Sequence, residues 1–212
     1  DGRFLALNSY ENRVYQIGIE DDVPVVAKFY RPGRWSDAAI QEEHDFAWEL
    51  AEQEIPVVAP YRSADGATLL HAHGFRFAVF PRRGGQWPDL NTREERQWMG
   101  RFIGRIHAVG ATRPFEHRPR LDLDTFGRQP RDRVLEPGVL PDYLQEAYSS
   151  LVDELLTTIE GRFLACEPLH NIRLHGDCHP GNILWREGVG PQFVDLDDCR
   201  SGPAVQDLWK IG

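Results

Sequence analysis

The chain has 212 residues, of which 41% are hydrophobic and 27% charged, and this ordinary globular composition excludes a largely disordered protein. A formal net charge of −9 argues against nucleic-acid binding through a basic face, because neutralising phosphates needs clustered Lys and Arg. Three cysteines without regular spacing predict no disulfide framework. No apolar run approaches the ~20 residues that are needed to cross a bilayer. We therefore expect a soluble cytoplasmic protein without a membrane partner.

The first 80 residues alternate short β-rich runs with turns. Runs at 14–19, 23–29, 68–71 and 75–80 predict a small antiparallel sheet. One helix is predicted at 37–53, because Ser36 can cap it and apolar residues recur at helical spacing until the chain approaches Pro56. These elements predict a β-rich lobe with a single helix.

The segment PRRGGQWP at 81–88 favours neither a helix nor a central strand, because paired glycines stand between two prolines. We therefore predict a hinge at 81–90, which separates an N-terminal lobe at 1–80 from a C-terminal lobe at 91–212.

Two helices are predicted beyond the hinge. The first has the capping-box pair Thr92 and Glu95 and ends at Gly110, and its apolar face is formed by Trp98, Phe102, Ile106 and Val109. The second follows Pro141, and its apolar stripe consists of Leu144, Ala147, Leu151, Leu155 and Ile159. Three short apolar runs then follow at 172–174, 183–185 and 193–196, and each ends beside polar residues.

The polar residues at these run ends indicate a site for chemistry. Asp177 and Asn182 are five positions apart, and Asp195 follows thirteen positions after Asn182. Such a loop can turn one carboxylate toward a substrate hydroxyl while an amide oxygen holds a metal. Mg²⁺ prefers hard oxygen ligands and takes only a few of them from protein. Asn182 and Asp195 are therefore candidate magnesium ligands.

Two motifs resemble a known superfamily. HGDCHPGN at 175–182 resembles the H-G-D-x-H-x-x-N loop of the aminoglycoside phosphotransferase and choline kinase superfamily, and VDLDD at 194–198 resembles its D-x-D element. Four further segments are similar to bacterial stress-response protein serine/threonine kinases within that superfamily: NSYENRVYQI at 8–17, KFYRPGRW at 28–35, EEHDFAWEL at 42–50 and GPAVQDLW at 202–209.

The resemblance implies an α+β, two-lobed protein-kinase-like fold that uses ATP and Mg²⁺. It places Lys28 on the ATP phosphates and Glu43 as its partner on the following helix. No G-x-G-x-x-G loop is present, so Ser9 and Asn12 are expected to supply phosphate contacts together with backbone N–H groups.

The resemblance also assigns roles in the second lobe. Asp177 is expected to act as the catalytic base, while Asp195 is both catalytic and, with Asn182, a metal ligand. Supporting positions are assigned to His175, His179 and Asp197. The implied reaction transfers the γ-phosphate of ATP to the hydroxyl of a protein serine or threonine in a bacterial stress response.

Each residue alone also has a structural interpretation. A lysine at a strand end is more often a solvated charge, and DCHPGN by itself is more often a turn. The joint occurrence of both motifs with Lys28 and Glu43 favours the active site. Two alternatives stay open, which are a small-molecule kinase acting on an amino alcohol, sugar or aminoglycoside, and a non-catalytic nucleotide-binding scaffold.

Two other kinds of chemistry are weaker candidates. Cys178 could act as a nucleophile, and a zinc site could draw on His175, Cys178, His179 and Cys199, but neither arrangement has the expected neighbours or spacing. Members of the superfamily continue on both sides of the matched region. We therefore expect a fold truncated at both ends, with some apolar surface exposed.

Overall fold

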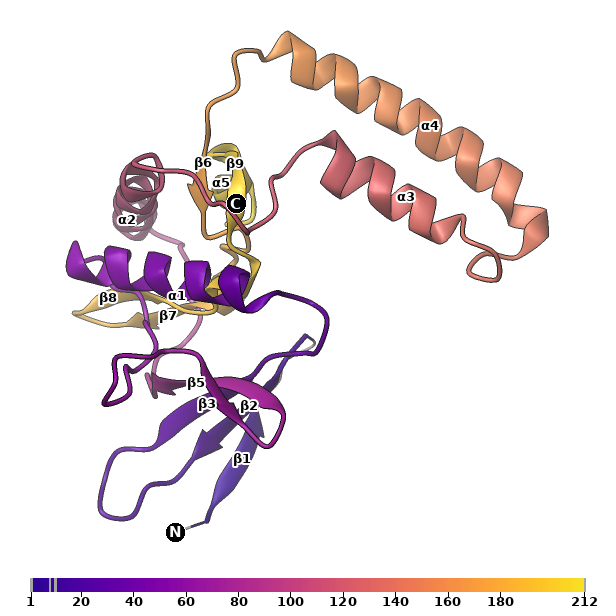
Figure 1. Cartoon of the computed structure of the whole chain (residues 1–212). Helices are drawn as coiled ribbons and strands as arrows, with labels where there is room; N and C mark the ends of the chain where they lie inside the picture. The colour runs from indigo at the N-terminus through magenta and orange to yellow at the C-terminus, as the bar shows by residue number, and fades with distance from the viewer. Residues whose placement is uncertain (1, 8, 10, 212) are drawn as a thin grey trace.

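A computed structural model describes residues 2–7, 9 and 11–211 (Figure 1). Four residues lie outside the described residues: 1, 8, 10 and 212. Residues 1 and 212 belong to the predicted lobes, and residues 8 and 10 belong to the 8–17 segment as well. The N-terminal part forms an antiparallel sheet, as predicted, and its five strands lie in the order β1-β2-β3-β5-β4. Its strands are β1 (Phe4–Leu7), β2 (Arg13–Ile17), β3 (Val25–Phe29), β4 (Leu70–Ala72) and β5 (Phe75–Pro81). Strand β1 is an addition to the predicted set.

Helix α1 (Asp37–Glu52) begins where the sequence predicted, because the Ser36 hydroxyl accepts a hydrogen bond from the backbone N–H of Ala39 at 3.1 Å. The helix lies between the sheet and the C-terminal half (Figure 1). Ile40 packs toward the sheet with Tyr30 and Ala78, whereas Phe46 belongs to the larger core of the C-terminal half. Because α1 contributes to both cores, it carries its polar residues along the boundary between the two halves.

The C-terminal half is built around α2 (Arg93–Gly110), whose capping box between Thr92 and Glu95 forms as predicted. The most buried residues of α2 are Met99, Ile103 and Ile106, so the buried face is rotated from the predicted one. Four short strands complete this half: β6 (Asn171–Leu174) pairs with β9 (Arg200–Pro203), and β7 (Ile183–Arg186) pairs with β8 (Gly190–Phe193). The short helix α5 (Val205–Trp209) follows β9.

The apolar run at 193–196 does not form one strand. Phe193 ends β8, and Leu196–Asp198 forms a 3₁₀ turn directly after it. The predicted hinge is joined to β7, because the backbones of Gln86 and Trp185 exchange two hydrogen bonds of 3.1 and 2.7 Å. The division of the chain into lobes at 81–90 stays a prediction.

A helical hairpin projects from the C-terminal half (Figure 1). It consists of a π-helical turn (Asp124–Arg128), α3 (Gln129–Val134) and α4 (Asp142–Ala165). The predicted apolar stripe of α4 is exposed, with 58% of Leu151 and 50% of Leu155 accessible to solvent. The expectation of exposed apolar surface therefore holds for this hairpin. No helix in the described part of the chain is long and apolar enough to cross a membrane.

Candidate active site

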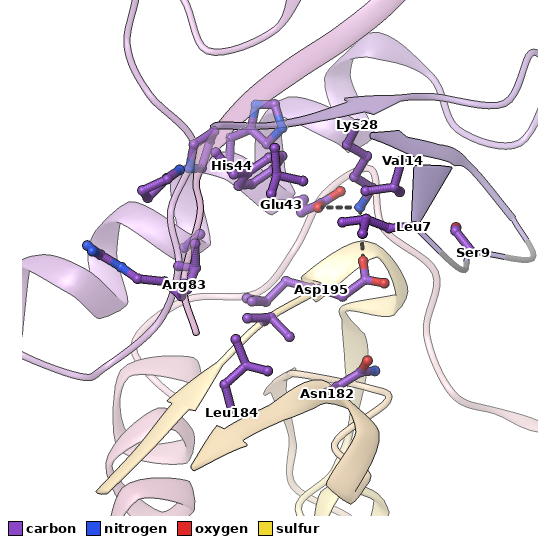
Figure 2. A pocket seen from close by; sticks show the side chains of 18 of the residues that line it. Leu7, Ser9, Val14, Lys28, Glu43, His44, Arg83, Asn182, Leu184 and Asp195 are labelled. Atoms are coloured by element: carbon purple, nitrogen blue, oxygen red, sulfur yellow. Dashed lines mark hydrogen bonds and ion pairs between the residues drawn. The ribbon is translucent and has the colours of Figure 1, made fainter. Parts of the chain in front are cut away.

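A cavity of about 360 Å³ opens between the inner face of the five-stranded sheet and the β7–β8 hairpin (Figure 2). The sheet contributes mainly apolar side chains, including Val14 and Val26, and the C-terminal half contributes Leu184 and Leu196. Polar groups gather at one end, where Lys28, Asn182 and Asp195 line the same space. A largely apolar cavity of this size with a few convergent polar groups is typical of a site for a small organic ligand.

Lys28 is the centre of the polar end. It points inward from β3, and its Nζ lies 3.1 Å from Glu43 Oε1 and 3.1 Å from Asp195 Oδ1 (Figure 2). Asp197 Oδ1 lies 3.0 Å from the same nitrogen. Only 5% of Lys28 is exposed, and burial by itself would lower its pKa. The surrounding carboxylates, Asp195 and Glu43 above all, outweigh burial and hold the pKa of Lys28 well above its ordinary value. The ammonium group is therefore charged at every physiological pH.

Glu43 is the predicted partner of Lys28 and lies on α1. Burial raises the pKa of Glu43, although the charges of Lys28 and Arg118 oppose that rise. Ion pairs of 3.1 and 2.7 Å bring these two cations to different oxygens of the carboxylate. The ionised form of Glu43 is therefore the one that satisfies both donors. The choice of Glu43 over its neighbour Glu42 agrees with this geometry, because Glu42 faces residues 116–118 instead.

Asp197 lies beside the same lysine and is buried. Burial would raise its pKa, but the charges of Lys28 and Arg34 outweigh it, so the pKa of Asp197 is lowered. Its two oxygens lie 3.0 Å from Lys28 Nζ and 3.3 Å from Arg34 Nη2. Asp197, which was predicted to have a supporting position, therefore lies next to Lys28.

The HGDCHPGN loop begins at the end of β6. Its first two backbone N–H groups, those of His175 and Gly176, donate to the buried carboxylate of Asp207 at 3.1 and 2.8 Å. The ring Nε2 of His175 lies 3.0 Å from the carbonyl oxygen of Val194. His175 thus connects the loop to the strand end before Asp195, which agrees with an orienting role.

Asp177, in the same loop, is partly exposed. Its Oδ2 accepts a 3.2 Å hydrogen bond from the side-chain amide of Asn182, and His179 Nε2 lies 3.5 Å from the same oxygen. The other oxygen, Oδ1, is in contact with the ammonium group of Lys210. Burial would raise the pKa of Asp177, but Lys210 outweighs it and the pKa is lowered. Asp177 is therefore an ionised carboxylate held from both sides.

Asn182 and Asp195 present oxygen atoms to the cavity. The Asn182 amide nitrogen is used by hydrogen bonds to Asp177, so its carbonyl oxygen stays available. The side chain of Asp195 is 49% exposed, and its backbone is left-handed with φ +57°. The backbone N–H of Val194 donates to the backbone carbonyl of Asn182 at 3.0 Å, which holds Asn182 close to Asp195.

The side-chain oxygens of Asn182 and Asp195 are suitable ligands for a magnesium ion. Amide and carboxylate oxygens are the hard ligands that Mg²⁺ prefers, and Mg²⁺ takes its other ligands from phosphate and water. No group of three or more His, Cys, Asp or Glu side chains suited to a metal occurs among residues 2–7, 9 and 11–211.

The predicted phosphate-contacting residues of the β1–β2 connection differ from each other. Ser9 lines the cavity, and its hydroxyl accepts a 3.2 Å hydrogen bond from the backbone N–H of Asn12. The Asn12 side chain is buried, and its oxygen accepts the backbone N–H of Arg31 at 3.1 Å. Asn12 therefore fixes the turn and does not line the cavity, and the phosphate contact predicted for Ser9 stays a prediction.

Three basic residues of the site were missed by the sequence analysis. Arg34 reaches the 195–198 turn, with Nη2 3.1 Å from Asp198 Oδ1, and Arg118 and Lys210 contact Glu43 and Asp177 respectively. Arg34 and Lys210 lie in or next to segments that carry the resemblance, but their partners are far away in sequence. Arg118 had no signal, because nothing near it in sequence marks a site.

The cysteine alternatives lose support. Cys178 and Cys199 are both buried, and burial raises the pKa of the Cys178 thiol far above its ordinary value and that of Cys199 to about 12. A thiol with a raised pKa is a poor nucleophile and a poor metal ligand at neutral pH. These two side chains instead belong to the apolar core.

The cavity lies between the N-terminal sheet and the C-terminal half, and the sequence places the chain in a family. The sequence profile of the phosphotransferase enzyme family (APH) matches residues 3–212. The chain therefore belongs to the phosphotransferase enzyme family. This membership confirms the superfamily resemblance of the two motifs.

Curated relatives with similar sequences include stress response kinase A of Escherichia coli K12, which is 46% identical over 211 residues. A relative in Salmonella typhimurium, serine/threonine protein kinase RdoA, is 44% identical over 211 residues. In both comparisons the match covers 100% of this chain and 63% of the relative, so the chain spans less than two thirds of their length.

Solved structures confirm the fold. An amicoumacin kinase in complex with AMP-PNP, Ca²⁺ and its ligand superposes with a TM-score of 0.76 at 21% identity, over 98% of this chain and 62% of that one. A microcompartment-associated aminopropanol kinase gives a TM-score of 0.73 at 21% identity, over 97% of this chain and 67% of that one. The α+β kinase-like architecture predicted from the sequence is thus shown.

Proposed function

We propose that the chain is the catalytic part of an ATP- and Mg²⁺-dependent protein kinase, which transfers the γ-phosphate to a serine or threonine hydroxyl in a bacterial stress response. The observation that carries the proposal is that Lys28, Asn182 and Asp195 line one cavity and Asp177 is hydrogen-bonded to Asn182, in a chain 46% identical to stress response kinase A. An intact set of these four residues favours turnover over a non-catalytic scaffold.

Each residue of the site would have a role that follows from its position. The apolar part of the cavity would take the adenine ring, and Lys28 would neutralise the phosphates from the sheet side. Bound Mg²⁺ would supply further neutralisation of the triphosphate, held by the oxygens of Asn182 and Asp195. Asp177 would orient the acceptor hydroxyl and take its proton. Its contacts with Asn182 and Lys210 keep the carboxylate ionised and in place before the acceptor arrives.

The nature of the acceptor separates the proposal from its alternative. The names of the sequence relatives favour a protein acceptor, whereas the structural neighbours, among them the aminopropanol kinase, favour a small molecule. Lys210 provides a physical argument, because it places a cation against Asp177 where the acceptor must bind. Amino alcohols and aminoglycosides carry ammonium groups, which a neighbouring lysine would repel. The site therefore suits a neutral or acidic peptide better than a cationic small molecule.

The experiment incubates the protein with γ-labelled ATP and Mg²⁺. One set of reactions contains generic protein substrates, and a second contains amino alcohols, sugars and aminoglycosides. We expect label in protein serine or threonine alone. Label in a small metabolite would replace the proposal by the small-molecule alternative, and no transfer together with retained nucleotide binding would favour the scaffold.

Asp177→Asn tests the proposed base. The variant should lose transfer by at least about 100-fold, the usual contribution of general-base catalysis, while binding AMP-PNP as the parent does. Asp124→Asn is a matched control, because Asp124 is an exposed carboxylate on the projecting hairpin with an ion pair to Arg128. Equal loss in both variants, or unchanged transfer in Asp177→Asn, would remove Asp177 from the mechanism.

A further inference from the structure

Residues 116–118 form a short strap across α1, between α2 and the projecting hairpin. The carboxylate of Glu42 accepts all three of its backbone N–H groups, from Glu116 at 2.6 Å, His117 at 2.8 Å and Arg118 at 2.9 Å. Glu42 directly precedes Glu43 on the helix. The strap is therefore fixed to the turn of α1 that carries the partner of Lys28.

Arg118 reaches from this strap into the molecule, and its side chain has no exposed surface. Its guanidinium donates to Glu43 Oε2 at 2.7 Å, to the carbonyl of Asp197 at 2.6 Å and to the carbonyl of Ala39 at 2.8 Å. The group also lies 4.5 Å from the ring centroid of Trp35. A planar guanidinium can bond several acceptors in fixed directions, which an ammonium group cannot do.

The three acceptors belong to the two elements that build the polar end of the cavity. Glu43 and Ala39 lie on α1, whereas Asp197 lies in the turn that follows Asp195. Since Arg118 takes Oε2 of Glu43, only Oε1 is left to face Lys28, at 3.1 Å. Removing the guanidinium would take its donors away from the buried Glu43 Oε2 and from the Asp197 carbonyl, which favours rearrangement.

We propose that Arg118 is a positioning residue for the nucleotide: it fixes the Lys28–Glu43 pair and the Asp195–Asp197 turn in the single arrangement that receives the triphosphate. The inference rests on the proposed function, because it assigns the phosphates of ATP to this end of the cavity. Helix α1 cannot move away from the turn without breaking the bonds that Arg118 makes to both.

The test compares two buried arginines that hold the same helix. Arg173 is 1% exposed, donates to Glu49 on α1 at 2.7 Å and to the Val109 carbonyl at 3.0 Å, and lies 4.6 Å from the Phe46 ring. None of these partners lines the cavity. Arg118→Lys and Arg173→Lys therefore make the same chemical change at two similar sites, of which only one touches Glu43.

The measurements are the dissociation constant of Mg·AMP-PNP by calorimetry, the thermal midpoint, and the KM values for ATP and acceptor. We expect Arg118→Lys to weaken AMP-PNP binding and raise the KM for ATP by at least about ten-fold, with the KM for the acceptor unchanged. Both variants should lower the thermal midpoint by a similar amount, but Arg173→Lys should leave AMP-PNP binding within about two-fold of the parent.

If Arg118→Lys does not fold, Glu42→Gln tests the same strap, because it removes the charge that binds the three N–H groups, and it should weaken AMP-PNP by about three-fold. Equal weakening by Arg118→Lys and Arg173→Lys would show a general structural role and overturn the inference, as would unchanged binding in Arg118→Lys. If AMP-PNP binding depends on Arg118 as expected but the parent phosphorylates nothing, the result would contradict the proposed function alone. A parent that does not bind AMP-PNP would overturn both.

Discussion

His44 is a buried histidine next to Glu43 in the sequence, and it makes the stability of the protein depend on pH. It has no exposed surface, and its ring nitrogens lie 2.7 Å from the Tyr30 hydroxyl and 2.8 Å from the Thr68 hydroxyl. Burial, reinforced by the charges of Lys28 and Arg118, lowers its pKa from 6.5 to about 3. The folded protein therefore keeps His44 neutral at pH values where the unfolded chain protonates it.

The sign and size of the effect follow from this difference. The stability contributed by neutral His44 is fully present above pH 6.5 and is lost as the pH falls toward about 3. Between pH 7.5 and pH 5.0 the linkage relation gives a loss of about 2 kcal/mol in the free energy of unfolding. This loss is a substantial part of the total stability of a typical domain.

The assay is urea unfolding at pH 7.5 and 5.0 for the parent and for His44→Gln. Glutamine keeps one donor and one acceptor but does not titrate, so the parent should lose about 2 kcal/mol more than the variant on acidification. His71→Gln is the control, because it makes the same substitution at a side chain that is 57% exposed. Equal losses in the parent and His44→Gln would refute the reasoning.

Three further predictions concern the site and its loop. Lys28→Met should lower the free energy of unfolding by about 3 kcal/mol, because it leaves the buried Glu43 and Asp197 with only their arginine partners. A thermal melt measures this effect, and an unchanged midpoint would contradict this account. Asp195→Ala should reduce the ratio of AMP-PNP affinity with Mg²⁺ to that with EDTA by about ten-fold, whereas an equal ratio in parent and variant would exclude Asp195 as a ligand. Gly176→Ala should cost about 2 to 4 kcal/mol in urea unfolding, because φ is +83° and the new Cβ would meet the carbonyl oxygen of Asp198; Gly33→Ala, at φ +77° in open space, should cost only about 1, and equal costs would disprove the steric argument.

Local signals in the sequence were sufficient for most of the elements. The Ser36 cap and the Thr92–Glu95 capping box each depend on residues three positions apart, so they form wherever the helix forms. The five-residue interval from Asp177 to Asn182 is also local, and the structure joins them by a direct hydrogen bond. The roles predicted for these two residues in catalysis and metal binding stay predictions until the variants are measured.

Periodicity could not show which helix face would be covered. The stripe of α4 repeats at helical spacing, yet Leu151 and Leu155 are exposed in the projecting hairpin. The face of α2 was predicted one position away from its most buried residues, Met99 and Ile103. A repeat tells which residues share a side, whereas burial depends on what packs against that side.

The sequence by itself determined the family, the helix starts and the short loop that brings Asp177 and Asn182 together, because each of these depends on residue type and near spacing. Only the tertiary structure decided the charge arrangement around the cavity. Lys28 meets Asp195 across 167 positions, and Arg118 meets Glu43 across 75. No local pattern specifies such pairs, since they exist only after α1 is packed between the sheet and the C-terminal half.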